Sequence, residues 1–381
     1  MGIHRGHRAH PFERLAEWLI FGVSFSTIGV VFLIFLFVGK EALPVALERQ
    51  NSALIREVIP PSDIDKLSSA ELQQYLELTP KQFAEMDRET LQMLMEIRVE
   101  ANDEIPAHIR EDKDATLNTA TWRHMVLPHQ WSGYEQPEYI WQPVGSIHKY
   151  NIVPLIVGTL KTTVVGLLFA VPLALGAAIY VSQLASQRVK EWVKPGIELL
   201  SGIPSVVMGM FALVVMATFL QKVFGYEVRL NAFVAGIALG MAVIPLVFSI
   251  AEDALTSVPR SYSQAALALG ASKWQATYQV VLPSALPGVF AAVVLGFGRA
   301  IGETMIVLLV CSASVMSWSL FDSARSITTT IAAEMAEAVA GGTHYRILFL
   351  LGALLFAATF ITNLIGDLVI HHFKGRLEGK K

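Results

Sequence analysis

The chain has 381 residues, of which 53% are hydrophobic and only 16% are charged, and its mean hydropathy is +0.50. Since a soluble domain carries about 25% charged residues, this composition favours a protein that crosses a membrane several times. The net charge of −3 gives no basic surface field of the kind that attracts nucleic acid. The single cysteine, Cys311, excludes an intramolecular disulfide, and its apolar neighbours predict a buried thiol.

The first 38 residues divide into a polar leader and an apolar segment. Residues 1–18 contain three arginines and three histidines. We interpret them as a solvated cytoplasmic leader rather than a metal site, since no cysteine or acidic cluster completes a ligand set. Residues 19–38 form an uncharged run that is long enough to span the bilayer core. The run exceeds the apolar region of most signal peptides and no clear cleavage site follows it, so we expect a retained helix.

Residues 39–153 have a charged composition that predicts a soluble, mostly helical insert of two or three short helices. Ser62 and the Thr79-Pro80 pair are candidate helix starts. Apolar residues then recur at roughly helical spacing at Phe83, Met86, Leu91, Leu94 and Met95. The tryptophans at positions 122, 131 and 141 are better explained by packing against the membrane side of the protein than by a ligand site.

Five further apolar segments bring the predicted number of transmembrane helices to six. They are residues 156–181, 197–220, 232–250, 288–315 and 347–370. Pro172, Pro204 and Pro245 interrupt three of them, which a spanning helix tolerates where neighbours or water satisfy the freed backbone groups. We therefore predict an all-α, polytopic membrane protein in which residues 154–373 form the core.

The distribution of lysine and arginine over the loops predicts the orientation. With the N-terminus inside, the cytoplasmic segments, including a tail at residues 374–381, hold twelve basic residues. The short outer loops hold only Lys222, Arg229, Arg325 and Arg346. The insert is left out of the comparison, because long domains cross a membrane largely regardless of charge. We expect both termini in the cytoplasm and the insert outside.

The cytoplasmic loop at residues 251–287 predicts two short helices that are separated by a glycine turn. Its first half is rich in the helix formers Ala265, Ala266, Leu267 and Leu269. Gly270 can end this helix in the left-handed conformation. Trp274 and Tyr278 give the second helix an apolar face, and Pro283 and Pro287 are expected to end it before the membrane. Such a compact unit suits the groove of a partner protein.

The spacing in this loop resembles the EAA coupling loop of ABC importer permeases, E-A-A-x3-G-x9-I-x-L-P. The chain has Gln264 in place of the Glu and Val280 in place of the Ile. The resemblance implies a type I ABC importer permease fold, and contacts to a separate ATPase from Gln264, Ala265, Ala266, Gly270, Leu282 and Pro283. No G-x-x-x-x-G-K-[ST] phosphate loop occurs in the sequence, so we expect no cofactor in this chain. ATP and Mg²⁺ would be bound and hydrolysed by a partner, and the chain would be a transport subunit rather than an enzyme.

The apolar segment at residues 288–315 carries two charges, Arg299 and Glu303. Arg299 is expected roughly 16 Å along this helix, near the middle of a ~30 Å core, where an arginine costs about 2.5–3.5 kcal/mol. Glu303 would lie on the same helical face and could pair with it. The pair could simply lock two helices. We favour a functional charge, because burying an ion pair seldom adds stability and a guanidinium binds a tetrahedral oxyanion through two hydrogen bonds.

Residues 295–305, LGFGRAIGETM, resemble a motif of the Pst-type phosphate importer permeases, and more specifically of their C-type member. Residues 202–207, 326–328 and 334–338 match the same pattern, and the resemblance covers about residues 155–370. It implies that Arg299, Glu303 and Thr304 line the path of phosphate.

The resemblance further implies a subunit of an ATP-driven phosphate importer in the bacterial inner membrane. The expected partners are a second, A-type permease, an ATPase dimer, an extracytoplasmic phosphate-binding protein and membrane lipid, with no nucleic acid. An importer of another oxyanion, such as molybdate or sulfate, is the nearest alternative, and the Arg299–Glu303 pair favours phosphate. A secondary transporter would leave residues 251–287 unconstrained. A scaffold or phosphate sensor is a further alternative, and a bare scaffold would not require Arg299 in the membrane.

Overall fold

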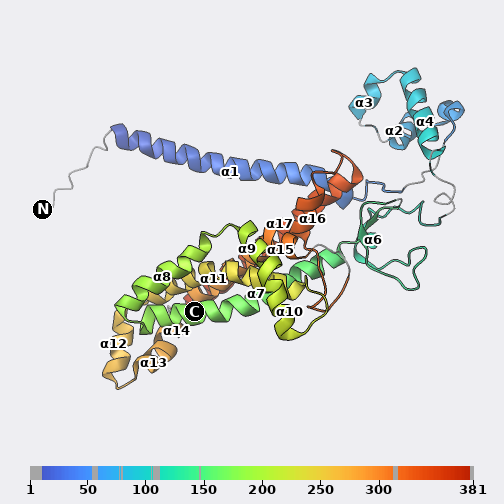
Figure 1. Cartoon of the computed structure of the whole chain (residues 1–381). Helices are drawn as coiled ribbons and strands as arrows, with labels where there is room; N and C mark the ends of the chain where they lie inside the picture. Colours follow the sequence, from blue (N-terminus) through green and yellow to red (C-terminus); the bar gives the residue numbers. More distant parts are fainter. Residues whose placement is uncertain are drawn as a thin grey trace.

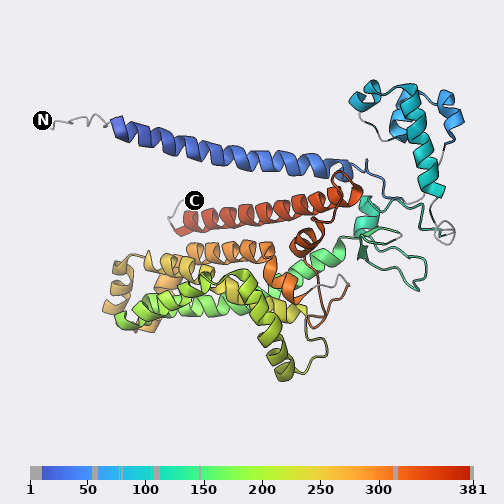
Figure 2. The same ribbon diagram turned by 45° about the horizontal axis from the view of Figure 1, so that its top comes forward.

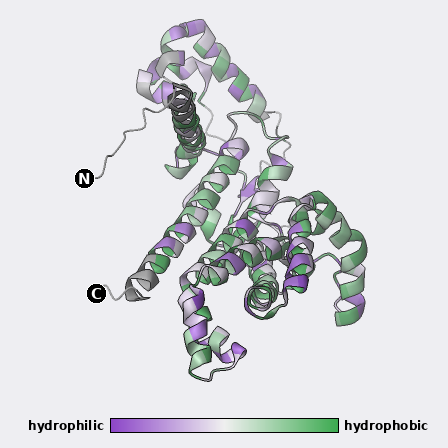
Figure 3. Cartoon of the chain, turned by 90° about the vertical axis from the view of Figure 1, so that its left-hand side faces the viewer, coloured by the Kyte–Doolittle hydropathy of each residue, from purple (hydrophilic) through white to green (hydrophobic). Residues whose placement is uncertain are grey.

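Six helical segments of the computed structural model are long and apolar enough to cross a membrane, as predicted. The structure describes residues 11–53, 59–76, 78, 80–103, 105, 112–145, 147–311 and 316–377. Within this part of the chain the candidate spans are Trp18–Ala46, Val153–Leu184, Ser205–Phe224, Ala232–Thr256, Lys273–Gly302 and Thr343–Ile370. Figure 3 shows that hydrophobic residues, in green, dominate the long helices.

Helix α1 (Pro11–Ala46) stands apart from the central bundle and packs mainly on α17 (Thr343–Leu377), as Figures 1 and 2 show. Two perpendicular aromatic pairs join the helices. The ring centroids of Phe35 and Phe356 are 4.1 Å apart, and those of Phe37 and Phe349 are 5.4 Å apart. Most apolar side chains of α1 are exposed. The helix extends beyond the predicted run at both ends, whereas residues 1–10 of the predicted leader and residues 378–381 of the predicted tail lie outside the described residues.

The centre of the bundle is formed by α7 (Val153–Ile179), α11 (Ala232–Thr256) and α14 (Leu282–Gly302). The backbones of α7 and α11 approach so closely that a Cβ atom on Gly240 would lie 2.7 Å from the carbonyl oxygen of Gly166. Small residues therefore bring the two helices together, as is common between membrane helices. Pro172 and Pro245 lie inside α7 and α11 without ending them.

Two predicted helices are broken, so their predicted extents are wrong. The predicted segment 197–220 is divided at residues 202–204, because Pro204 lacks an N–H and disfavours the helical conformation of the residue before it. The first part belongs to α8 (Gln187–Ser201). The second part comprises α9 (Ser205–Phe211), the π-helical segment η3 (Ala212–Met216) and α10 (Ala217–Phe224). The predicted segment 288–315 is divided at residues 303–304, between α14 and α15 (Met305–Val310).

The described part of the insert contains more helices than predicted. The 3₁₀ helix η1 (Pro61–Lys66) is followed by α2 (Ser69–Tyr75), α3 (Pro80–Glu85), α4 (Arg88–Asp103) and α6 (Trp122–Val126). Pro80 starts α3 as predicted, Ser62 lies inside η1, and Thr79 is outside the described residues. Leu91 and Met95 are buried in a small core with Ile64 and Leu72.

A second part of the insert packs on the C-terminal end of α1 and the N-terminal end of α17. Its strands β1 (Trp141–Gln142) and β2 (Lys149–Tyr150) pair antiparallel, with Trp141 opposite Tyr150. Both residues belong to a buried cluster that includes Val45 of α1 and Leu348 of α17. The indole Nε1 of Trp122 donates a hydrogen bond of 2.9 Å to the carbonyl oxygen of Ala46. Packing of these tryptophans against the helices is thus confirmed for Trp122 and Trp141.

The closest glycine contact in α7 provides a test of this packing. A Cβ atom on Gly158 would lie 2.2 Å from the carbonyl oxygen of Arg325, so the backbone would have to move. We expect Gly158→Ala to destabilise the protein by about 1–3 kcal/mol through overpacking. A lowered Tm of the purified protein in detergent would show this. Gly176→Ala in the same helix, where nothing lies within 4 Å, is the control and should leave the Tm unchanged or slightly raised. Equal Tm values for the two variants would contradict the prediction.

Candidate substrate pathway and coupling surface

A pocket of about 410 Å³ lies where the end of α8, the start of α9, the middle of α11 and the end of α14 meet. Its charged and hydroxyl-bearing lining residues are Glu198, Ser201, Ser205, Ser249 and Arg299. The lining residues of α11 fall within 242–249 of a helix that runs from Ala232 to Thr256. The pocket therefore lies about half-way along an apolar span.

Arg299 reaches this pocket from the last turn of α14. Close packing of α14 on α11 determines its place, because a Cβ atom on Gly296, one turn earlier, would lie 2.5 Å from Cγ2 of Val247. The Arg299 side chain is exposed and takes part in no ion pair with the described residues of the chain. A guanidinium in this setting can bind an anion that enters the pocket.

The predicted pairing of Arg299 with Glu303 on one helical face is wrong. Helix α14 ends at Gly302, and Glu303 has φ −70° and ψ 130°, which is extended backbone. No ion pair between Arg299 and Glu303 occurs among those of the described residues. Arg299 is also at the end of its helix rather than near the middle, although the pocket that it lines is beside the middle of α11.

The break at residues 303–304 is fixed by hydrogen bonds from α16 (Ile327–Glu334). The hydroxyl of Thr328 donates to the carbonyl oxygen of Glu303 at 3.0 Å. Ser326 and Thr329 form a capping box at the start of this helix, and the backbone N–H of Ile327 donates to the hydroxyl of Thr159 in α7. Thr304 adds a longer bond of 3.3 Å from its hydroxyl to the carbonyl oxygen of Gly302.

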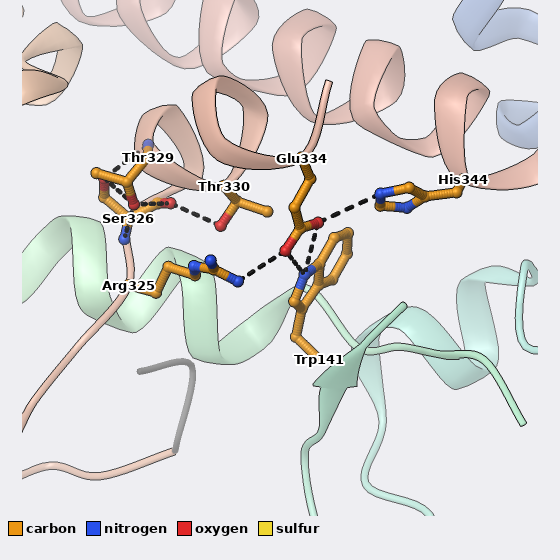
Figure 4. A network of polar contacts seen from close by, with 7 residues as sticks. All are labelled: Trp141, Arg325, Ser326, Thr329, Thr330, Glu334 and His344. Carbon is orange, nitrogen blue, oxygen red and sulfur yellow. Dashed lines mark hydrogen bonds and ion pairs between the residues drawn. The ribbon is translucent and has the colours of Figure 1, made fainter. Parts of the chain in front are cut away.

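At its other end α16 presents Glu334 to a buried polar network, shown in Figure 4. The carboxylate is 2.7 Å from Nη1 of Arg325, 3.4 Å from Nε2 of His344 in α17, and 3.2 Å from Nε1 of Trp141 in the insert. Burial raises the pKa of the Glu334 carboxyl, and the contacts with Trp141 and Arg325 oppose part of this rise. One carboxylate thus joins the insert, the loop before α16 and the start of α17.

Residues 251–287 form the predicted helix, glycine turn and second helix. Helix α12 (Arg260–Ala268) ends before Gly270, whose φ of 89° lies in the left-handed region. Helix α13 (Lys273–Ala276) begins with a capping box between Ser272 and Gln275. The rings of Trp274 and Tyr278 stack on the exposed face of this unit, with centroids 6.4 Å apart. Leu269 is 91% exposed, so the tip of this unit offers apolar surface to a partner.

Leu282 and Pro283 lie at the start of α14, and the expectation that Pro283 and Pro287 end the second helix is wrong. The π-helical segment η4 (Thr277–Val281) joins α13 directly to α14, so that one helical segment runs from Lys273 to Gly302. The wider turn suits the missing proline N–H, and the hydroxyl of Ser284 donates to the carbonyl oxygen of Val280 at 2.7 Å. Pro287 is buried inside the helix.

Glu198 was not among the residues predicted to line the pathway. This residue is the only carboxylate in the run Pro195–Pro204, just before the break that divides α8 from α9. The available signal was a lone acidic residue inside the predicted segment 197–220, but its distance in sequence from Arg299 concealed their common pocket.

The sequence matches a known family of membrane transport proteins. The family profile described as "Binding-protein-dependent transport system inner membrane component" matches residues 170–379. The chain belongs to this family. The permease is 34% identical over 226 residues to the "Probable ABC transporter permease protein YqgH" of Bacillus subtilis, covering 59% of this chain and 73% of that protein.

Two further relatives carry the description "Phosphate transport system permease protein PstC". The protein of Pasteurella multocida is 34% identical over 261 residues, which cover 63% of this permease and 80% of the relative. The protein of Mesorhizobium japonicum is 34% identical over 256 residues, covering 62% and 77%. The predicted fold class, an all-α ABC importer permease with six transmembrane helices in the inner membrane, is confirmed.

Proposed function

We propose that this permease carries phosphate across the bacterial inner membrane as one subunit of an ATP-driven importer. The supporting observation is the pocket in which Arg299 shares the lining with three serines, about half-way along α11. An anion crossing a low-dielectric core needs a compensating charge and hydrogen-bond donors, and a guanidinium fits a tetrahedral oxyanion through two hydrogen bonds. Two of the relatives reported above are phosphate transport permeases.

Glu303 and Thr304 extend this route beyond Arg299, at the break between α14 and α15. The break places irregular backbone and the half-buried carboxylate of Glu303 within an apolar segment, an arrangement that membrane proteins tolerate where irregular backbone lines a cavity. Molybdate or sulfate would also suit a guanidinium, so the anion carried is decided by the uptake experiment below.

Three kinds of protein partner complete the importer. An ATPase dimer would bind ATP and Mg²⁺ and dock on α12 and α13 through Gln264, Ala265, Ala266 and Gly270, as the coupling-loop spacing suggests. A second, A-type permease would cover part of the exposed apolar face of α1 and close the pocket, whose residues Glu198 and Arg299 are exposed in the single chain. A phosphate-binding protein would deliver its anion at the end that carries the insert.

Both termini of this subunit would be cytoplasmic. The N-terminal end of α1, the C-terminal end of α17 and helices α12 and α13 lie toward one side of the molecule, on the left in Figures 1 and 2, and the insert lies on the right. The excess of lysine and arginine in the loops at the end that carries α12 and α13 supports a cytoplasmic location for that end.

Cysteine labelling tests this orientation in a Cys311→Ala background. An impermeant maleimide should label Glu96→Cys, on the exposed face of α4, in right-side-out vesicles. Lys273→Cys, in the coupling surface, should react only in inverted vesicles. The reverse pattern would overturn the orientation and, with it, docking of a cytoplasmic ATPase on α12 and α13.

Gly270 provides the test of docking. With φ at 89° and nothing within 4 Å of its Cβ position, a side chain there meets backbone strain alone. We expect Gly270→Val to cost about 1–3 kcal/mol locally and to lose the ATPase subunit on co-purification, while the protein still inserts in the membrane. Gly270→Asn, which tolerates this conformation, is the control and should retain the ATPase. Equal retention by both variants would count against this turn as part of the docking surface.

Arg299 provides the test of the pathway. We expect Arg299→Gln to reduce uptake of radiolabelled phosphate by at least about tenfold, the effect of losing a charged hydrogen bond, with normal assembly. Arg299→Lys should restore only part of the uptake, because an ammonium cannot reproduce the planar fork. Uptake is measured in cells that lack other phosphate importers, with the amount of assembled complex as control. Full phosphate uptake by Arg299→Gln would refute the role of Arg299 in the pathway. If the wild-type protein took up molybdate or sulfate instead of phosphate, the transported anion would be reassigned.

A further inference from the structure

We propose that Glu198 makes the Arg299 pocket selective for oxyanions that carry a proton, by accepting a hydrogen bond from the P–OH group of phosphate. The inference rests on the proposed function and extends it from the cargo to the residue that distinguishes phosphate from sulfate.

The position of Glu198 is fixed by the end of α8. Glu198 lies one helical turn before the break at residues 202–204, and its backbone carbonyl oxygen accepts a hydrogen bond of 2.6 Å from the hydroxyl of Ser201. Glu198 lines the same pocket as Ser249 of α11 and Arg299 of α14. Three helices therefore bring a carboxylate, hydroxyls and a guanidinium to one cavity.

The carboxylate of Glu198 differs from the other carboxylates near it. Glu252 is 2.7 Å from Lys194 Nζ, and this hydrogen bond raises the pKa of Lys194. Glu191, on the same helix as Glu198, accepts a hydrogen bond from the Gln187 amide. The Glu198 carboxylate has no ion pair within 4 Å and no side-chain hydrogen bond with any residue that the structure describes. It lies close enough to Lys194 to contribute to the raised pKa of that ammonium, but its lone pairs are available to a ligand.

A carboxylate without an ion-pair partner within 4 Å needs a chemical explanation when it lines an anion pathway. Two like charges repel, and the repulsion grows as water is excluded and the effective dielectric constant falls. Sulfate and molybdate carry no proton at neutral pH, so all their oxygens are acceptors and meet this repulsion at Glu198. Phosphate near pH 7 keeps at least one P–OH group, which donates a short, charge-assisted hydrogen bond to a carboxylate. The same residue is thus a barrier to one anion and a ligand of the other.

The remaining groups of the pocket suit the other phosphate oxygens. Arg299 can donate two hydrogen bonds to unprotonated oxygens, and the hydroxyls of Ser205 and Ser249 are further donors on the same lining. The charges of Glu198 and Arg299 cancel, so the pocket has no net positive charge to retain the anion. Weak binding of this kind permits release, which a conduction pathway requires.

Anion binding to the purified permease and ATPase complex, without the extracytoplasmic binding protein, tests the selectivity of the pocket itself. Radiolabelled phosphate is measured by equilibrium dialysis at pH 7, with arsenate, which keeps a proton, and sulfate as competitors. In the wild-type complex arsenate should displace phosphate at least about tenfold more effectively than sulfate does, a difference of one charged hydrogen bond. In Glu198→Gln, whose amide can donate to any oxyanion, sulfate should compete within about threefold of arsenate.

Glu191→Gln is the matched control, because Glu191 is an exposed residue of the same helix outside the pocket. It should keep the wild-type preference, and both variants should match the wild type in Tm and subunit content. Unchanged discrimination against sulfate in Glu198→Gln would overturn the role of Glu198 while leaving phosphate transport intact. An equal loss of affinity for every anion in Glu198→Gln would also overturn the role of Glu198 in selectivity, and would leave it a role in maintaining the structure of the pocket. A wild-type complex that neither binds nor transports phosphate would overturn both proposals.

Discussion

Close backbone packing around α11 is the constraint on which the rest of the permease depends. Gly166 and Gly240 bring α7 against one side of α11, and Gly296 brings α14 against Val247. In a membrane the surrounding lipid is as apolar as a helix surface, so association depends on such close fit rather than on the removal of apolar area from water. Because Gly296 sits one turn before Arg299, the same contact that holds α14 also directs the guanidinium to the pocket beside the middle of α11.

Hydropathy and local spacing were sufficient to predict six spans, the turn at Gly270 and the apolar face of Trp274 and Tyr278. These features depend on residues that are near one another in sequence. Helix breaks were harder to predict from the sequence. Residues 303–304 interrupt an apolar run that contains no proline, and their conformation is held by Thr328, which is distant in sequence.

The polar residues that share the pocket of Arg299 could not be predicted from local rules. The i,i+4 relation pointed to Glu303, but the helix ends one residue before it. Glu198 and Ser249 reach the pocket from two other helices, and only the packing of α8, α11 and α14 brings them together. Conversely, Pro283 and Pro287 were expected to stop a helix, yet the wider turn of η4 directly precedes the first of them and the helix continues through both. The roles of Gln264, Arg299, Glu303 and Thr304 stay predictions.

The continuous helical segment from Lys273 to Gly302 has a mechanical consequence. Its 30 residues span about 45 Å at 1.5 Å per residue, with stacked aromatic rings near one end and Arg299 near the other. No loop interrupts this segment, so a tilt or rotation of its Lys273 end would displace the guanidinium directly as long as the π-helical turn at η4 keeps its shape. If an ATPase binds α12 and α13 as proposed, a movement of these helices would reach Arg299 as a displacement of charge, without an intermediate loop.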